Sequence, residues 1–209
     1  MTAVNLMLGN GFVMTRAPQK RKVQTRGRML DIAREIVEKQ GFAALRVEDV
    51  VAGAQVAKGT FFSHFQDKDG ILIVLAGEIL AHHLDDMTNR PAPESLDDMM
   101  TGLEPLVGFL ASDRIVFDIF IAYSGAIRGP AHEAIAQSLE RATKIFTDWT
   151  THMTQHGLVR QDVDPARLAE GILAFKSHVL ALHHCTDAKD PGRAVKALGP
   201  FLREWLVLR

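Results

Sequence analysis

The sequence has very little cysteine and no long apolar run. Its single cysteine, Cys185, excludes an intramolecular disulfide, and such sparse use of cysteine suits a reducing cytoplasm. A membrane-spanning helix needs about 18 consecutive apolar residues, whereas the most apolar stretch, residues 71–80, is interrupted by Glu78. We therefore expect a cytoplasmic protein with no membrane partner.

Motifs that support catalysis or cofactor binding are also missing. The chain contains no GxSxG, no HExxH and no glycine-rich phosphate loop, so we expect neither an enzyme nor a cofactor. His152 and His156 are spaced i, i+4, but no tight motif joins them to an acid or a cysteine, and we expect no metal site. A metal-responsive protein, or one that uses Cys185 as a redox switch, is the alternative.

Residues 46–68 have the pattern of two short helices around a tight turn. Residues 47–53 and 58–65 form the helices, and residues 54–57 form the turn. An apolar set can meet on one inward side: Val47, Val50, Val51, Ala54, Val56, Phe61 and Phe65. Lys58, Thr60, Ser63 and His64 then point outward, beside Gly59, which permits close backbone approach. These are groups that reach phosphates and base edges when a helix lies in the major groove of DNA.

Basic residues precede this motif, although the formal net charge of the chain is only −1. Residues 1–28 contain no acidic side chain and six basic ones: Arg16, Lys20, Arg21, Lys22, Arg26 and Arg28. A cluster of this kind binds phosphates by releasing their counterions, and the alternative is a solvated tail. We expect residues 1–24 to be a flexible basic arm that contacts DNA.

The flanking helices complete a recognisable order. An amphipathic helix is expected over residues 26–40, with Gly41 at its C-terminal cap and Asp67 as the N-cap of a helix over residues 68–86. From residue 25 to about residue 72 the chain resembles the TetR family of bacterial transcription regulators. The successive pieces are ARE-IVEKQGFAALRVEDV, AKGTFFSHF and DKDGIL. The resemblance implies a DNA-binding domain over residues 25–70.

The resemblance also assigns DNA contacts and shows three departures from the family pattern. It implies that Lys58, Gly59, Thr60, Phe62 and His64 touch DNA, and that Lys68 binds a phosphate. Phe62 replaces a phosphate-binding tyrosine, and Gln55 replaces a turn glycine, which demands either strain or another turn geometry. Arg46 and Ala57 replace the capping Ser or Thr of the two helices. Arg46 is itself a candidate phosphate ligand.

The rest of the chain, residues 71–209, reads as all-helical. We expect an all-α protein of about nine helices, in which a three-helix head precedes a larger helical bundle. Glu104-Pro105 predicts a kink or break, and Asp113 caps a following, nearly apolar helix. Gly157 ends a long helix, and Asp164-Pro165 opens the next as an N-cap followed by proline.

In the resembling family this bundle binds a small effector, and its last two helices pair with a second subunit. We therefore expect a homodimer on a near-palindromic double-stranded operator, and a repressor released by a largely apolar effector. Candidate pocket residues are Met100, Phe109, Phe117, Phe120, Tyr123, Phe146, Trp149, Met153, Phe175 and His178. The alternatives are that these residues only pack in the core, that the chain is a monomeric bundle which buries the apolar faces of its last two helices internally, and that it is a protein-interaction module that does not read DNA.

Overall fold

The computed structural model describes residues 16–124, 130–186 and 190–207. These residues form nine α-helices and one short 3-10 helix and contain no strand, which confirms the all-α expectation. None of the described helices combines the length and the apolar composition that a membrane span requires. The elements, in order, are α1 (Arg16–Gln40), η1 (Phe42–Ala44), α2 (Val47–Gly53), α3 (Lys58–Phe65), α4 (Lys68–Asn89), α5 (Leu96–Ser112), α6 (Arg114–Ser124), α7 (Pro130–Gln155), α8 (Pro165–Cys185) and α9 (Gly192–Leu206).

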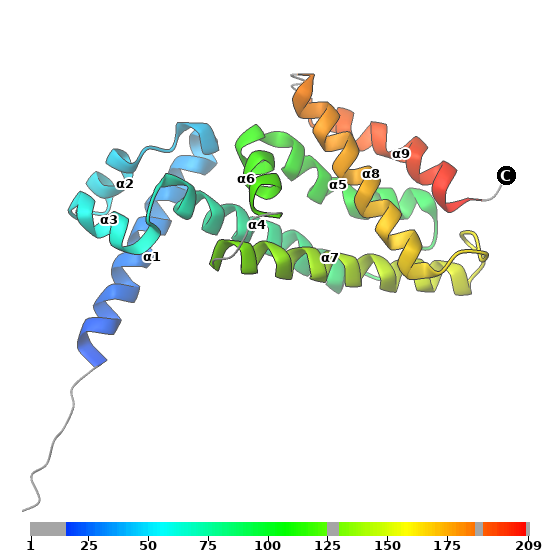
Figure 1. Ribbon diagram of the computed structural model, residues 1–209, viewed down its shortest axis with the longest axis horizontal. Helices are drawn as coiled ribbons and strands as arrows, with labels where there is room; N and C mark the ends of the chain where they lie inside the picture. Colours follow the sequence, from blue (N-terminus) through cyan, green and yellow to red (C-terminus); the bar gives the residue numbers. More distant parts are fainter. Residues whose placement is uncertain (1–15, 125–129, 187–189, 208–209) are drawn as a thin grey trace, which may run out of the picture.

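A small head at the N-terminal end of the molecule is built from α1, η1, α2 and α3. Met29, Leu45, Val50 and Phe61 are fully buried where these helices meet. The first helix is longer than expected, because residues 16–24, which we predicted to be flexible, belong to α1. Figure 1 shows this basic first part of α1 extending away from the head. Residues 1–15 of the predicted arm lie outside the described residues.

The turn between α2 and α3 takes the strained form rather than another geometry. Gln55 has a φ of 52°, in the left-handed region that favours glycine, so a side chain here costs about 1 kcal/mol. Neither Arg46 nor Ala57 caps its helix through a side chain, as expected from their types. Asp67, by contrast, is the predicted N-cap of α4, and its carboxylate accepts a hydrogen bond from the Gly70 N–H at 2.8 Å.

Helix α4 is shared by the head and the larger body. Its buried residues run along almost its whole length: Ile71, Leu72, Ile73, Leu75, Ala76, Leu80, Leu84 and Met87. The start of α4 packs on α1 and α3, and the remainder packs on α5, α6 and α7. The boundary that we predicted at residues 70 and 71 therefore falls inside one continuous helix, so the two parts are joined by a shared element rather than by a linker.

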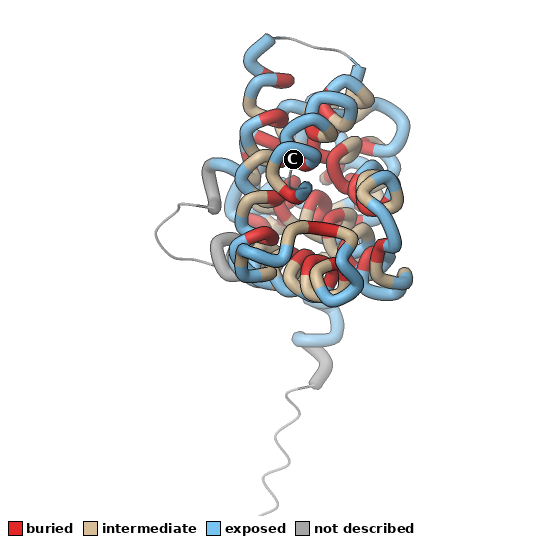
Figure 2. The backbone as a smooth tube through the Cα atoms, turned by 90° about the vertical axis from the view of Figure 1, so that its right-hand side faces the viewer, coloured by how far each residue is buried: buried red, intermediate tan, exposed pale blue. Residues whose placement is uncertain are grey.

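The body consists of α5 to α9 packed around the second half of α4. Figure 1 shows α4 and α7 side by side, with α8 and α9 on the outer side of the body. In Figure 2 the buried segments face the interior of the bundle and the exposed segments face outward. Pro105 does not break α5, which is one helix from Leu96 to Ser112. Burial of Met99, Leu103 and Leu106 on its inner face outweighs the roughly 3 kcal/mol that an interior proline costs.

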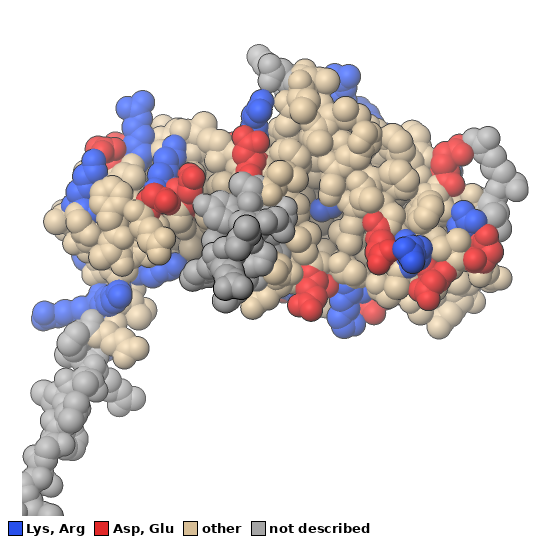
Figure 3. Space-filling model, viewed as in Figure 1, with Lys and Arg blue, Asp and Glu red and all other residues tan. Residues whose placement is uncertain are grey.

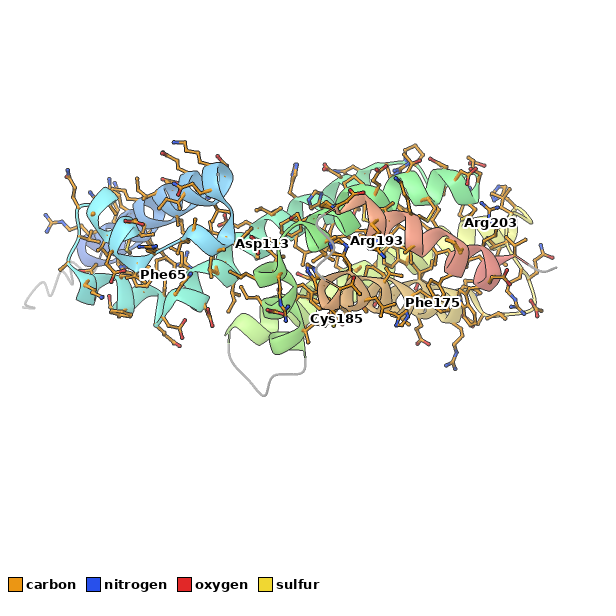
Figure 4. All side chains as sticks on the ribbon, turned by 90° about the horizontal axis from the view of Figure 1, so that it is seen from above. Phe65, Asp113, Phe175, Cys185, Arg193 and Arg203 are labelled. Atoms are coloured by element: carbon orange, nitrogen blue, oxygen red, sulfur yellow. The ribbon has the colours of Figure 1, made fainter. Side chains whose placement is uncertain are left out.

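Asp113 makes a second connection between head and body. As predicted it caps α6, since its Oδ1 accepts a hydrogen bond from the Ile115 N–H at 2.8 Å. Its Oδ2 accepts another at 3.1 Å from the N–H of Phe42, in η1 of the head. Figure 4 shows Asp113 at the junction of the two parts. One carboxylate thus satisfies an unpaired N–H group in each part of the molecule.

Substitution of Asp113 should therefore lower the free energy of unfolding by more than is usual for a half-buried residue. Asp113→Ala removes a helix cap and leaves the Phe42 N–H without an acceptor, so we expect the free energy of unfolding to fall by about 1–3 kcal/mol. Urea unfolding followed by circular dichroism measures this loss. Asp118→Ala is the control, because Asp118 on the same helix only pairs with Arg114 at the surface and should cost less than about 1 kcal/mol. Equal losses in the two variants would contradict this role.

Candidate DNA-binding surface and ligand cavity

Helix α3 is held from its inner face and leaves its outer face free. Phe61 is 0% exposed and Phe65 is 4% exposed, and their rings pack together with centroids 5.3 Å apart. Lys58, Gly59, Phe62 and Ser63 are exposed, and Phe62 keeps 42% of its surface accessible. A Cβ added at Gly59 would meet no atom within 4 Å. Thr60, also predicted to point outward, is half-buried, so the exposed part of this surface consists of Lys58, Gly59, Phe62 and Ser63.

Lys58 is already paired in this surface. Its Nζ donates a hydrogen bond to Oε1 of Glu48 on α2 at 2.7 Å, and both side chains are exposed. The hydrogen bond from Lys58 lowers the pKa of Glu48, so the acid is ionised at neutral pH. The cation at the start of α3 is therefore neutralised by an acid of α2, a partner that the spacing of the sequence did not suggest.

His64 is less exposed than predicted. It is half-buried, its Nδ1 is buried, and this atom has no hydrogen-bond partner among the described residues. Burial lowers the pKa of His64, and the nearby charges of Lys22 and Arg26 lower it further. The imidazole is thus neutral at pH 7 and lies next to the basic face of α1.

Further cations surround α3. Figure 3 shows Lys and Arg side chains around the head and on the extended part of α1. Arg26 lies over the ring of Phe65, 4.9 Å from its centroid. Arg46 is exposed at the start of α2, and Lys68 is half-exposed at the start of α4. These positions suit phosphate contacts on both sides of α3.

A cavity of about 690 Å³ lies where the head meets the body. One side of it runs along α4 from Gly70 to Leu84, and the opposite side comes from α5, α6 and α7. His64 and Phe65 reach its head end. Figure 4 locates Phe65 in the head, next to α4. The volume is in the range of pockets that bind drug-sized ligands.

Two of the ten candidate pocket residues, Phe109 and Phe120, line this cavity. Phe146, Trp149 and Met153 are buried in the core elsewhere, and Phe117 is stacked on His184. Met100 is half-buried and His178 is exposed, and neither belongs to the cavity wall. Phe175 stacks on Phe201 of α9, with ring centroids 5.2 Å apart. The side chain of Tyr123 lies outside the described residues.

The wall also includes α4 residues that sequence reasoning did not select, such as Ile73, Gly77 and Ala81. Their apolar pattern was interpreted as belonging to a buried connecting helix. That interpretation is correct for the opposite side of α4, but a single apolar pattern does not distinguish a packed face from one that borders a cavity. Contacts from distant helices decide this.

Lys176 on α8 is a charged residue in the interior of the body. It is 3% exposed, and its Nζ lies 5.2 Å from the ring centroid of Phe120. Burial lowers the pKa of Lys176 from 10.5 to about 8. Below about pH 8 the folded protein therefore holds a poorly solvated ammonium group, which opposes folding. This opposition fades as the pH rises toward the value of a hydrated lysine.

His183 and His184 extend the same inner side of α8 toward the end of α5. Their Nε2–H groups donate hydrogen bonds to the carbonyls of Ala111, at 3.1 Å, and Leu110, at 2.9 Å. They thereby satisfy carbonyls that the helix terminus leaves without partners. Cys185 is exposed rather than packed. Among the described residues, no three His, Cys, Asp or Glu side chains are grouped to hold a metal ion.

Replacing Lys176 by methionine should stabilise the protein. At pH 7 we expect the free energy of unfolding to rise by about 3 kcal/mol, since each unit of pKa shift corresponds to roughly 1.4 kcal/mol. The gain should vanish as the pH approaches 10.5, the ordinary lysine value, because the unfolded chain then loses its proton too.

Urea unfolding from neutral to alkaline pH measures this difference. Lys144→Met is the control, because Lys144 is an exposed residue of α7 that pairs with Asp148, and it should change stability by only about 0.5 kcal/mol. A Lys176→Met protein no more stable than wild type at pH 7 would contradict a buried ammonium.

Comparisons with known proteins agree with this arrangement of a head and a helical body. Residues 29–75 match the model of the bacterial regulatory proteins of the tetR family. Over 154 residues the chain is 27% identical to the HTH-type transcriptional regulator YvdT of Bacillus subtilis, across 71% of this chain and 74% of YvdT.

Two solved structures share the fold. A TetR-family regulator from Pectobacterium atrosepticum superposes with a TM-score of 0.65 at 19% identity, covering 91% of this chain and 98% of that one. FadR of Thermus thermophilus, a TetR-family repressor solved in complex with lauroyl-CoA, gives a TM-score of 0.59 at 18% identity and covers 88% and 96%. With its helix-turn-helix head and all-helical body, this chain carries the DNA-binding domain of the bacterial regulatory proteins of the tetR family over residues 29–75 and shares the fold of TetR-family regulators.

Proposed function

We propose that the protein is a repressor that leaves its operator when a small, largely apolar molecule occupies the cavity. The observation that carries this proposal is the position of the cavity along α4, the helix that also bears the head. The T. thermophilus structure with lauroyl-CoA supports an apolar ligand. Residues 25–70 then act as the DNA-binding part and residues 71–209 as the effector-binding and dimerisation part.

In this proposal α3 enters the major groove. Lys58, Thr60, Ser63 and His64 reach base edges, since a cation, hydroxyls and an imidazole are the groups that read them. The exposed ring of Phe62 packs against the sugar-phosphate backbone, and Gly59 lets that backbone come close. Arg46 and Lys68 bind phosphates on either side, and the basic part of α1 adds attraction that does not depend on sequence.

Reading a near-palindromic operator requires two copies of the head. Helices α8 and α9 offer a face for this, because Leu182 is 50% exposed and Phe201 is 37% exposed. Phe175 supports Phe201 by stacking, and the small Ala174 is exposed nearby on α8. Pairing of this face in a two-fold dimer would set the two recognition helices about one DNA turn, roughly 34 Å, apart. Phe175 and His178, first considered as pocket residues, are assigned to this face.

In a dimer, the distance between the two DNA-binding heads can take two values, one that fits the operator and one that does not. An effector acts only if it binds these two forms of the dimer with different affinity. A ligand in the cavity contacts α4 along its length and touches α3 through His64 and Phe65. Any movement of α4 against α6 and α7 therefore moves the head directly. A ligand in the cavity favours the form of the dimer in which the distance between the two recognition helices does not fit two successive major grooves.

Fluorescence anisotropy on tiled duplexes from the DNA flanking the gene tests the function. We expect one near-palindromic tile to bind in the nanomolar range at physiological salt. Gly59→Ala should weaken that binding roughly tenfold or more without destabilising the fold, because the added Cβ meets no protein atom and only DNA can clash with it.

Substitutions of proposed phosphate-binding and base-reading residues distinguish these two roles. Lys68→Ala should weaken binding to every sequence and flatten its salt dependence, whereas Thr60→Ala should change preference at particular base pairs by about 1–3 kcal/mol. Uniformly weak binding that is indifferent to Gly59→Ala would instead favour a protein-interaction module.

The ion pair between Glu48 and Lys58 makes a further prediction. Since Glu48 both neutralises Lys58 and adds negative charge to the surface, Glu48→Gln should tighten operator binding roughly two- to tenfold at low salt and steepen its salt dependence. Anisotropy titrations at several salt concentrations measure both effects. Glu35→Gln is the control, because Glu35 forms a similarly exposed ion pair with Lys39 on α1. If Glu48→Gln bound no more tightly than this control, the pair would have no part in DNA binding.

A further inference from the structure

Lys176 stands apart from the other charged residues. Among the described residues it is the only lysine or arginine that is buried, and it lies in the middle of α8, on the side that carries the buried Ile172 and Val179. Long basic side chains usually extend their charged ends to water, so a lysine with only 3% of its surface exposed needs a specific compensation.

Within the part of the chain that the structure describes, Lys176 forms no hydrogen bond or ion pair. Its one favourable contact is with the face of the Phe120 ring, 5.2 Å from Nζ. Such a contact offsets only part of the cost of enclosing an ammonium group. The interior charge is therefore only partly compensated by the protein.

Two charged residues of the cavity wall, Arg141 and Glu78, illustrate the contrast. Arg141 donates to Asp85 at 2.5 Å and to Thr88 at 3.3 Å. Glu78 accepts from Arg34 at 3.0 Å. Each of these charges has a partner of opposite sign, whereas Lys176 has none among the described residues. Lys176 thus lacks a neutralising anion among the described residues, and it lies next to the cavity through its contact with Phe120.

Phe120 joins Lys176 to the cavity. The ring that Lys176 contacts is itself part of the cavity wall, and Phe120 is half-buried at this position. Rotation of this one side chain would bring the ammonium group into contact with a molecule in the cavity. The wall on either side is apolar, with Ile119 on α6 and Leu80 and Leu84 on α4.

We propose that the effector is a largely apolar molecule with one acidic group, such as a carboxylate, that pairs with Lys176 when the Phe120 ring turns aside. This inference rests on the proposed function and specifies the chemical class of its ligand. The apolar part occupies the space along α4, and the acidic group reaches the interior of the body. A bulky, highly charged group would stay at the open side of the cavity instead, because Lys176 is buried behind the cavity wall rather than part of it.

The energetics favour an acid over its neutral analogue. An uncharged ligand of the same shape gains the apolar contacts but leaves the ammonium group uncompensated. An acidic ligand gains the same contacts together with a charge-assisted hydrogen bond in a site that excludes water. Lys176 lowers the stability of the ligand-free protein. It therefore enlarges the free-energy difference between the ligand-free and the ligand-bound protein, and a ligand-responsive protein depends on that difference.

Two fluorescent probes with similar aromatic skeletons test this pairing. Anilinonaphthalenesulfonate carries one negative charge, and phenylnaphthylamine carries none. We expect the full-length wild-type protein to bind the sulfonate at least tenfold more tightly than the amine in titrations at neutral pH. Lys176→Met should lose roughly tenfold or more of its affinity for the sulfonate and keep its affinity for the amine. Lys144→Met, which removes an exposed charge from α7, should behave like wild type.

Competition with decanoate and decanol then tests the carboxylate itself. Decanoate should displace the amine from wild-type protein more effectively than decanol, and this advantage should disappear in Lys176→Met. Absence of sulfonate binding to wild type, or equal weakening in the two lysine variants, overturns the proposal. So does an advantage of decanoate that survives in Lys176→Met.

Operator binding measured on the same proteins separates this inference from the proposed function. Lys176→Met should bind the operator as tightly as wild type without ligand, because Lys176 lies in the body. If decanoate releases wild-type protein and not Lys176→Met from the operator, both are supported. Charge-dependent probe binding without any operator binding would instead reject the repressor and keep the acid site.

Discussion

The rest of the structure depends on the burial of α4 in both parts of the molecule. Its apolar residues complete the core of the head at one end and the core of the body along the remainder. A helix fixed in this way transmits displacement as a rigid element, because a packed interface is bistable rather than continuously deformable. The orientation of the head therefore depends on that of the body. The cavity lies along this helix, so its contents and the position of α3 share one structural support.

Polar contacts on the other side of the bundle form a second connection between the body and the head. Lys176, His183 and His184 lie on the inner side of α8, and the two histidines hold the last carbonyls of α5. Directly after α5, Asp113 accepts a hydrogen bond from the N–H of Phe42 in the head. A shift of α8 caused by an anion at Lys176 thus acts on the end of α5, and through it on the head. The same helix contributes to the proposed dimer face, so ligand and subunit contacts act on one element.

Local signals in the sequence predicted most of the fold. Asp67 and the Asp164-Pro165 pair open helices where expected, because a capping carboxylate satisfies N–H groups of its own first turn. Gly157 ends α7 with a positive φ of 67°. Two predictions differ from the structure, one because of packing and the other because of local helix propensity. Of the kink or break predicted at Glu104-Pro105, the break does not occur, because buried residues on both sides of Pro105 hold α5 together. The flexible arm expected over residues 1–24 is partly helical, since basic residues of good helix propensity continue α1 outward from the head.

The functional surfaces were predictable to different degrees, for a physical reason. The outward face of α3 follows from helical periodicity and from the two buried phenylalanines, both local properties. The pocket does not, since Phe109 and Phe120 were among ten apolar candidates that periodicity cannot separate. Lys176 was not selected at all. In the segment AFKSHV it resembles a lysine on the exposed side of a helix, and only the fold shows that it is buried where α8 packs on α5, α7 and α9, with Phe120 of α6 beside its Nζ. A buried charge of this kind destabilises the protein unless a ligand compensates it, so selection for stability alone would replace it by an apolar residue. Its presence next to a cavity is therefore better explained by binding than by folding.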